Sequence, residues 1–246
     1  MTAESFQWVS PHWPAPRWVR AFTTERGARA PERPYDGINL AEHVEDEPGR
    51  VSQYRADLMA DLSLPEQPVW LDQVHGTTVI NIDSGPSAHS ADGAFTTKKG
   101  MVAAVLTADC APIFLTDRSG QFVGLLHGGW RGVAGGIVEQ GVKAVPASPG
   151  DLLAWVGPTI GPNYFEIGEE VKHQLVQDPT DEKYFAPSKD RFLADLPGLI
   201  VSRLRRAGVG FVAASNLCTY SDARRWFSYR RQGTCGRMAS LIWLAP

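Results

Sequence analysis

Apolar residues along this chain gather in short runs that turn-forming residues separate, a pattern typical of strands more than of long helices. Residues 101–106 are almost wholly apolar, as expected of a strand buried on both faces. Two more runs, 112–116 and 121–126, flank the turn-rich stretch 117–120 and predict a strand pair. The other predicted strands cover residues 68–71, 77–82, 152–156, 209–214, 226–229 and 239–244.

Helical spacing of apolar positions is confined to fewer segments. The predicted helices cover residues 51–61, 133–145, 169–177 and 192–207. Pro197 lies inside the last segment, where it breaks or restarts the helix. Because strands outnumber helices and many look paired locally, the pattern favours an α+β fold with mixed sheets over a doubly wound parallel fold. Residues 11–36, rich in proline and arginine, are expected to be irregular with short strands.

Composition and charge narrow the class of protein. A chain of 246 residues is ample for a buried core, and 43% of its residues are hydrophobic. The net charge of -3 indicates neither a nucleic acid nor an anionic membrane as partner, so an anionic substrate must be held by local arginines. Residues 1–8 do not resemble a signal peptide, and no apolar run reaches the roughly 18 residues of a membrane span. Three cysteines without a CxxC pair favour a reducing compartment, and the cytoplasm is the expected location.

Three short segments carry metal-binding side chains beside glycine or an apolar strand. They are residues 73–76, 107–110 and 126–132, which contain His75, Cys110 and His127. Two imidazoles and one thiolate make three ligands for a tetrahedral zinc and leave one position for water or substrate. Taken singly, each residue is more often a turn or core residue. Because strand ends can converge, we expect the three to form a catalytic centre for zinc, with copper as the alternative ion.

Other polar residues are candidates for substrate binding or catalysis. Asp109 is either a carboxylate that supports the metal ligands or acts as a general base, or a turn residue at the strand end. Arg131 begins a predicted helix, where the helix dipole disfavours a cation, so an anion-binding role is favoured over an exposed surface position. In a strand, Ser228 and Arg230 would share one face, directed either at a polar substrate or at solvent. The remaining candidates, otherwise surface groups, are Asn39, His43, Arg55 and Gln73.

Several of these segments resemble a known family. Gln-Val-His-Gly at 73–76, Thr-Ala-Asp-Cys at 107–110, His-Gly-Gly-Trp-Arg-Gly at 127–132 and Gly-Pro-Thr-Ile-Gly-Pro at 157–162 are similar to motifs of the laccase-domain family, also called YfiH-like or polyphenol-oxidase-like. The resemblance spans nearly the whole chain, so one catalytic domain over residues 1–246 is expected. It implies a four-layer α/β/β/α sandwich and a metal bound by His75, Cys110 and His127.

The resemblance also implies an activity. Members of the family look like purine nucleoside phosphorylases that act on adenosine, inosine and methylthioadenosine, with an associated adenosine deaminase activity. A multicopper oxidase needs many paired histidines, whereas this chain has six histidines and no His-x-His. We therefore expect a zinc-dependent phosphorylase with nucleoside and phosphate as its small-molecule partners.

Within that reading, Arg55 and Arg131 are expected to neutralise the phosphate, Asn39 and His43 to lie near ribose or phosphate, and Asp109 to carry a proton. A cysteine hydrolase is the second hypothesis: Cys110 would be a nucleophile activated by His127 or His75, acting on an amide or a peptidoglycan precursor. A copper polyphenol oxidase and a module that only binds nucleosides are weaker alternatives. The oligomeric state is left open.

Overall fold

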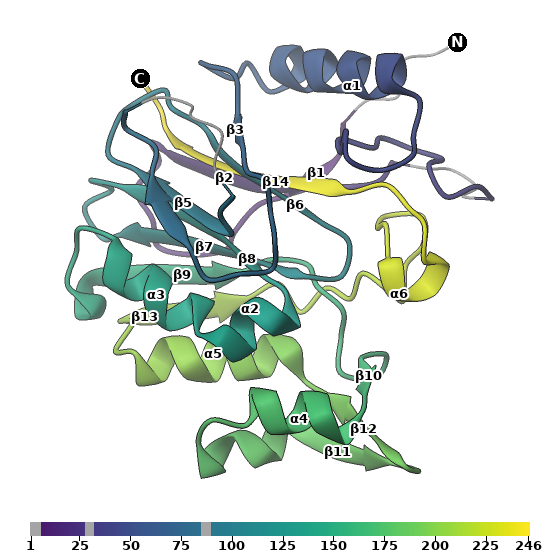
Figure 1. Ribbon diagram of the computed structural model, residues 1–246. Coiled ribbons are helices and arrows are strands. Elements are labelled where there is room, and N and C mark those ends of the chain that lie inside the picture. The colour runs from purple at the N-terminus through teal and green to yellow at the C-terminus, as the bar shows by residue number, and fades with distance from the viewer. Residues whose placement is uncertain (1–5, 28–31, 85–89) are drawn as a thin grey trace.

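The computed structural model of the chain describes residues 6–27, 32–84 and 90–246. Within these ranges the strands form two larger mixed sheets and one small antiparallel sheet (Figure 1). Part of the proline- and arginine-rich segment 11–36 and most of the N-terminal octapeptide lie outside the described residues. None of the described helices is long and apolar enough to cross a membrane.

The first sheet is built around a strand from the end of the chain. Its order is β1 (Trp8–Val9), β2 (Val19–Thr24), β14 (Met238–Leu244), β6 (Ala103–Thr107) and β3 (Val69–Trp70). Only β3 and β6 run parallel to each other, and the other neighbours are antiparallel. All seven residues of β14 and all five of β6 are buried, which explains the continuous apolar runs in the sequence.

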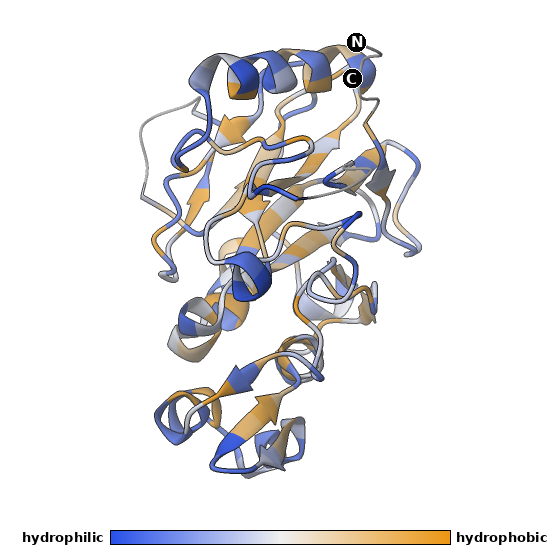
Figure 2. Ribbon diagram, turned by 90° about the vertical axis from the view of Figure 1, so that its right-hand side faces the viewer, coloured by the Kyte–Doolittle hydropathy of each residue, from blue (hydrophilic) through white to orange (hydrophobic). Residues whose placement is uncertain are grey.

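The second sheet contains the predicted strand pair. Its order is β13 (Phe211–Ala214), β9 (Leu152–Val156), β7 (Ala111–Asp117), β8 (Val123–Gly128), β5 (Gly93–Thr96) and β4 (Val79–Asn81). Strands β7 and β8 are antiparallel neighbours, as predicted, while the pairs β4–β5 and β9–β13 are parallel. Side chains of both sheets, such as Val105 and Phe114, share one buried apolar cluster, and Figure 2 shows apolar residues concentrated along the strands.

Helices cover the outer faces of these sheets. Helix α1 (Pro48–Asp61) packs Leu58 into a cluster with residues of β6 and β14, on the face of the first sheet away from the second. The helices over the second sheet are α2 (Trp130–Gly135), α3 (Ile137–Ala144) and α5 (Leu196–Arg206). The mixed α/β character and the mixed sheets are confirmed, while the strict four-layer order stays a prediction. The structure adds a small third sheet beside α4 (Glu169–Leu175), with the order β10 (Glu166–Ile167), β12 (Arg191–Ala194) and β11 (Phe185–Ser188).

Three predicted elements differ from the structure, each for a local reason. The helix predicted over 133–145 is divided, because Gly136 has φ 97° and ends α2 in the left-handed region. The helix predicted over 192–207 begins only at Leu196, since residues 191–194 form β12 and Pro197 fits the first helical turn. The strand predicted over 226–229 is wrong: Ser228 caps helix α6 (Tyr229–Gln232) by accepting a hydrogen bond from the Arg231 amide. Two 3₁₀ turns, Pro149–Asp151 and Pro179–Tyr184, complete the described helical elements.

Candidate metal centre

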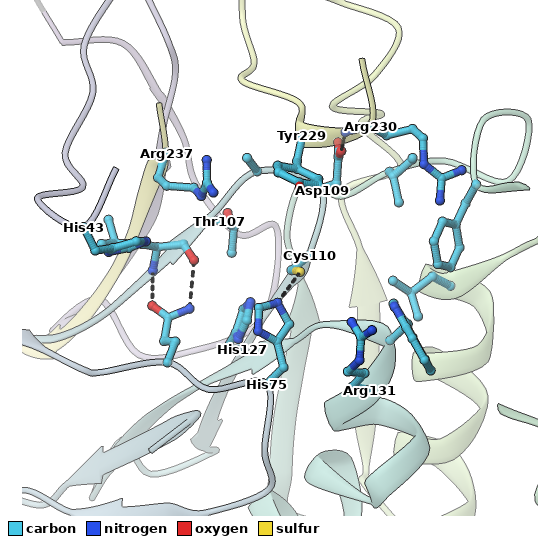
Figure 3. Close-up of a pocket in the computed structure, with 17 residues that line it drawn as sticks. His43, His75, Thr107, Asp109, Cys110, His127, Arg131, Tyr229, Arg230 and Arg237 are labelled. Carbon is cyan, nitrogen blue, oxygen red and sulfur yellow. Dashed lines mark hydrogen bonds between the residues drawn. The ribbon is translucent and has the colours of Figure 1, made fainter. Parts of the chain in front are cut away.

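The structure brings the three predicted metal ligands together from three segments. His75 lies in the loop between β3 and β4, Cys110 lies between β6 and β7, and His127 lies in β8. The antiparallel register pairs Ala111 with Gly128, so Cys110 and His127 are held at the same end of the β7–β8 pair. One ligand atom from each residue lies within 4.8 Å of the other two, and Cys110 Sγ is 3.8 Å from His75 Nε2 (Figure 3). This spacing suits one shared ion.

A buried carboxylate orients two of the ligands. Asp92, which has no exposed surface, accepts a hydrogen bond at 2.7 Å from His127 Nδ1. The backbone amides of Val74, His75 and Gly76 also donate to this carboxylate, at 3.2, 3.0 and 2.6 Å. His75 needs this support because its φ of 59° lies in the left-handed region, which costs a non-glycine residue roughly 1–2 kcal/mol. With Nδ1 bound to Asp92, His127 turns Nε2 to the ligand cluster, the arrangement typical of metal-binding histidines.

The electrostatics of the cluster favour the ligand form of the thiol. Burial alone would raise the pKa of Cys110, but the neighbouring His127 and His75 outweigh burial and lower this pKa to about 6. Burial would lower the pKa of His127, yet the charge of Cys110 and the hydrogen bond to Asp92 raise it to about 9. The thiol is therefore ionised more readily than a free cysteine, and His127 releases a proton when its Nε2 binds an ion. A thiolate and two imidazoles, one backed by a carboxylate, form a donor set that fits zinc.

Asp109, next to Cys110, anchors the turn that carries the thiol. Its φ is 90°, and its carboxylate accepts hydrogen bonds from Thr219 Oγ1 at 2.6 Å, Ser228 Oγ at 3.0 Å and the Arg230 amide at 2.7 Å. Its carbonyl oxygen accepts a further bond, at 2.6 Å, from Thr159 Oγ1. These contacts fit the structural role of a turn residue, one of the two roles that the sequence analysis considered for Asp109. Proton transfer by Asp109 stays a prediction.

The three ligands lie at the floor of a cavity of about 430 Å³. Of the sequence candidates, His43, Gln73, Asp109, Arg131 and Arg230 also line it. The Gln73 amide is tied to the backbone of Leu106, with Oε1 accepting at 2.7 Å and Nε2 donating at 2.9 Å. The other lining residues are Leu106, Thr107, Ala108, Trp130, Ile160, Phe165, Leu196, Tyr229 and Arg237.

Three sequence candidates lie behind the cavity wall instead. Asn39 is fully buried, and its amide is bonded to Asp46, to the backbone of Ala41 and to the Arg237 amide. Arg55 donates to the Leu40 carbonyl, pairs with Glu42 at 2.9 Å and lies over the Trp70 ring. Ser228 is buried against Asp109. The side chains of these three residues contact other protein groups, so they stabilise the structure around the cavity.

Residues outside the sequence candidates are as prominent in the site as those inside. These residues include Asp92, Thr107 and Arg237, which long-range strand pairing brings to the site. Thr107 is the last residue of β6 and pairs with Met238, the first residue of β14, so Arg237 lies just beyond it. A signal was available for Thr107, which falls inside the motif segment 107–110, but nothing in the sequence distinguishes Asp92 from a turn residue.

Comparison with known proteins gives a consistent result. A family model described as multi-copper polyphenol oxidoreductase laccase matches residues 20–245. Purine nucleoside phosphorylase YfiH from Escherichia coli (strain K12) is 40% identical over 238 residues, which cover 96% of this chain and 98% of the relative. A purine nucleoside phosphorylase from Pseudomonas aeruginosa is 41% identical over 240 residues, with the same two coverages of 96% and 98%.

Solved structures agree with the sequence relatives. The crystal structure of a Neisseria meningitidis protein matches with a TM-score of 0.90 at 36% identity, covering 98% of this chain and 100% of that chain. YlmD from Geobacillus stearothermophilus matches with a TM-score of 0.86 at 28% identity, covering 99% of this chain and 100% of that chain. On the family match and the identity with these relatives over nearly their full length, the chain belongs to the multi-copper polyphenol oxidoreductase laccase family.

Proposed function

We propose that this chain is a purine nucleoside phosphorylase that cleaves adenosine, inosine and methylthioadenosine with phosphate at a zinc centre, with adenosine deaminase as a side activity. The names of the Escherichia coli and Pseudomonas aeruginosa relatives support the class of reaction. The observation that carries the proposal for this chain is the cavity itself, in which a possible ion site is surrounded by arginines and aromatic rings.

Positive charge in the cavity is suited to phosphate. Arg131, Arg230 and Arg237 line it, and among the described residues none of the three has a carboxylate oxygen within 4 Å. Asp109 is the one acidic residue on the described wall, and its two oxygens already accept three hydrogen bonds. Because the whole chain has a net charge of -3, this is a local concentration of cations, as recognition of an anionic substrate requires.

The lining also suits a nucleoside. Trp130, Phe165 and Tyr229 offer aromatic faces, and Ile160 and Leu196 add apolar surface for a purine. A cavity of about 430 Å³ lies in the ordinary range for small-molecule sites, which is about 300–1,000 Å³. The lining therefore holds an apolar heterocycle and an anion close together, as a two-substrate phosphorolysis requires.

In phosphorolysis, the bond from ribose C1′ to the purine nitrogen breaks and a bond from C1′ to a phosphate oxygen forms. The base leaves with the bonding electron pair and takes up a proton. Arginine in the cavity holds the phosphate and neutralises its charge, while the aromatic walls hold the base, so the protein contributes mainly positioning and charge stabilisation. An ion held by His75, Cys110 and His127 would supply Lewis-acid polarisation of a substrate oxygen.

A nucleoside panel tests the proposal. Purified protein is incubated with adenosine, inosine or methylthioadenosine, with and without phosphate, and free bases and sugar phosphates are measured by chromatography. We expect free base and sugar 1-phosphate in equal amounts only when phosphate is present, and inosine from adenosine in either condition. Base release at the same rate without phosphate, or no base release from any nucleoside, would refute phosphorolysis.

A cysteine hydrolase is the second candidate, and one observation favours it. The low pKa of Cys110, beside a histidine that a carboxylate orients, is the arrangement of an activated nucleophile. Metal analysis separates the two readings, because an ion bound through the sulfur occupies the nucleophile. Stoichiometric zinc in the active protein supports the phosphorylase, whereas a metal-free active protein that an alkylating agent inactivates supports the hydrolase.

A further inference from the structure

The cavity has two chemically different halves on either side of the three ligands. Figure 3 shows His43, Thr107 and Arg237 on one side of the cluster, and Arg131 and Arg230 on the other. The arginines of the second side lie over aromatic rings: Arg131 over Trp130, at 4.4 Å from the ring centroid, and Arg230 over Phe165, at 5.3 Å. That half combines cations with stacking surfaces. The half around Arg237 has one longer contact of this kind, Arg237 over Tyr229 at 5.9 Å, and adds the polar groups of His43 and Thr107.

Thr107 is the most informative residue of the polar half of the cavity. Its side chain is only 1% exposed, and its hydroxyl has no hydrogen-bond partner among the described residues. A buried hydroxyl without a partner is destabilising, so such a group is normally satisfied by a ligand or an ordered water. Thr107 lines the cavity, and the register of β6 and β14 places it opposite Met238, the residue that follows Arg237. The hydroxyl is therefore a donor available to a ligand bound next to Arg237.

Two hydrogen bonds tie the backbone of Arg237 to the segment that carries His43. The Arg237 amide donates to Asn39 Oδ1 at 2.8 Å, and the Arg237 carbonyl accepts from the Leu40 amide at 3.3 Å. The loop that carries His43 is thus bonded to the backbone of Arg237. The guanidinium uses Nη1 on the carbonyls of Cys235 and Gly236, at 2.6 and 3.1 Å, and it is half-buried. These hydrogen bonds hold the guanidinium group in place while its remaining donors face the cavity.

The electrostatic field in the half of the cavity around Arg237 is positive. Burial first, and then the charges of Arg237 and Arg55, lower the pKa of His43, and only Asp72 acts in the opposite direction. Arg55 is already paired with Glu42, whereas Arg237 has no acidic partner within 4 Å among the described residues. An anion bound here would relieve this uncompensated charge and accept from the Thr107 hydroxyl.

We infer that Arg237, Thr107 and His43 form the phosphate subsite, and that the half with Trp130, Phe165, Arg131 and Arg230 takes the nucleoside base. This inference rests on the proposed phosphorylase function and gives the direction in which the two substrates lie. It assigns the anion to Arg237 in place of Arg131 and Arg55, the sequence candidates. Phosphate in this position accepts charge-assisted hydrogen bonds from the guanidinium and a neutral one from the threonine.

The test measures phosphate and nucleoside dependence separately. Arg237→Gln and Thr107→Val are compared with wild type and with Arg224→Gln, a matched control at an exposed arginine that does not line the cavity. Steady-state rates are measured against inorganic phosphate at saturating inosine, and against inosine at saturating phosphate. Binding of inorganic phosphate alone is measured by titration calorimetry, and circular dichroism checks that each variant is folded.

We expect the KM for phosphate to rise about 10- to 100-fold in Arg237→Gln and about 3- to 10-fold in Thr107→Val. The KM for inosine should change by less than about threefold in both, Arg237→Lys should recover part of the loss, and Arg224→Gln should match wild type. A rise in the KM for inosine with an unchanged KM for phosphate overturns the subsite and leaves the phosphorylase function standing. If wild type cleaves no nucleoside, the proposed function fails, and calorimetry alone decides the subsite: equal phosphate binding by wild type and Arg237→Gln, or none by wild type, overturns it.

Discussion

Replacing Asp92 by asparagine should weaken metal binding far more than it weakens the fold. The substitution keeps the size of the side chain and removes its charge, so a carboxylate that accepts four hydrogen bonds around His75 and His127 becomes an amide with one accepting oxygen. His127 Nδ1 and the His75 amide share one carboxylate oxygen, and the Val74 and Gly76 amides share the other, so the amide can accept from only one of these two pairs. Loss of such outer carboxylates typically costs 10- to 100-fold in metal affinity, or about 1.4–2.7 kcal/mol.

Competition against a chromophoric chelator measures the zinc dissociation constant of each variant. Asp83→Asn is the matched control, because the Asp83 carboxylate also accepts several hydrogen bonds, from Thr96 and Thr97, but touches none of the three ligands. Both variants should lose stability in urea unfolding by similar amounts. Only Asp92→Asn should show the rise in the zinc dissociation constant.

A zinc affinity of Asp92→Asn within twofold of wild type would refute the reasoning. It would show that His75 and His127 keep their geometry without the carboxylate. Equal losses of affinity in Asp92→Asn and Asp83→Asn would also refute it, since the effect would then follow general destabilisation.

Three further predictions concern the site and the helix that follows it. Cys110→Ala should abolish both nucleoside activities and stoichiometric zinc while leaving the circular dichroism spectrum unchanged; full phosphorolysis in this variant would disprove the metal role. The pKa of Cys110 is lowered to about 6, so the thiolate is present above that pH. Alkylation of the metal-stripped protein by iodoacetamide should therefore rise with pH around 6 and not near 8.5, and zinc should block it. A rise in alkylation only near 8.5 would contradict the electrostatic argument. Gly136→Ala should lower the free energy of unfolding in urea by about 1–2 kcal/mol, because φ is 97° at this position. The cost comes from the backbone and not from a clash, since the nearest atom to an added Cβ, an oxygen of Glu139, is 3.6 Å away. An unchanged urea midpoint would show that the α2–α3 junction can shift.

The sequence supports the prediction of the ligands better than that of their surroundings. His75, Cys110 and His127 each lie in a segment with recognisable glycines and strand ends, and the β7–β8 register brings two of them together as the strand pattern suggested. Asp92 belongs to no such segment. Its partners are 16 to 35 residues away along the chain, so only the folded structure assigns it a role.

Errors in the predicted elements arise where a tertiary contact competes with local preference. Trp226, Phe227 and Tyr229 have the composition of a strand. In the structure, the Asp109 carboxylate accepts from Ser228 and from the Arg230 amide, and this fixes the start of a helix there. A hydrogen bond to a residue more than 100 positions away is invisible to any local pattern.

Strand β14 has a consequence for how the protein is synthesised. It is the last strand along the chain, yet it lies between β2 and β6 and hydrogen-bonds to both. Until residues 238–244 emerge from the ribosome, two apolar strands made much earlier have open edges, a condition that favours aggregation. Thr107 and Arg237 also meet only through this pairing. We therefore expect a nascent chain to need protection by chaperones, and the half of the cavity around Thr107 and Arg237 to assemble last.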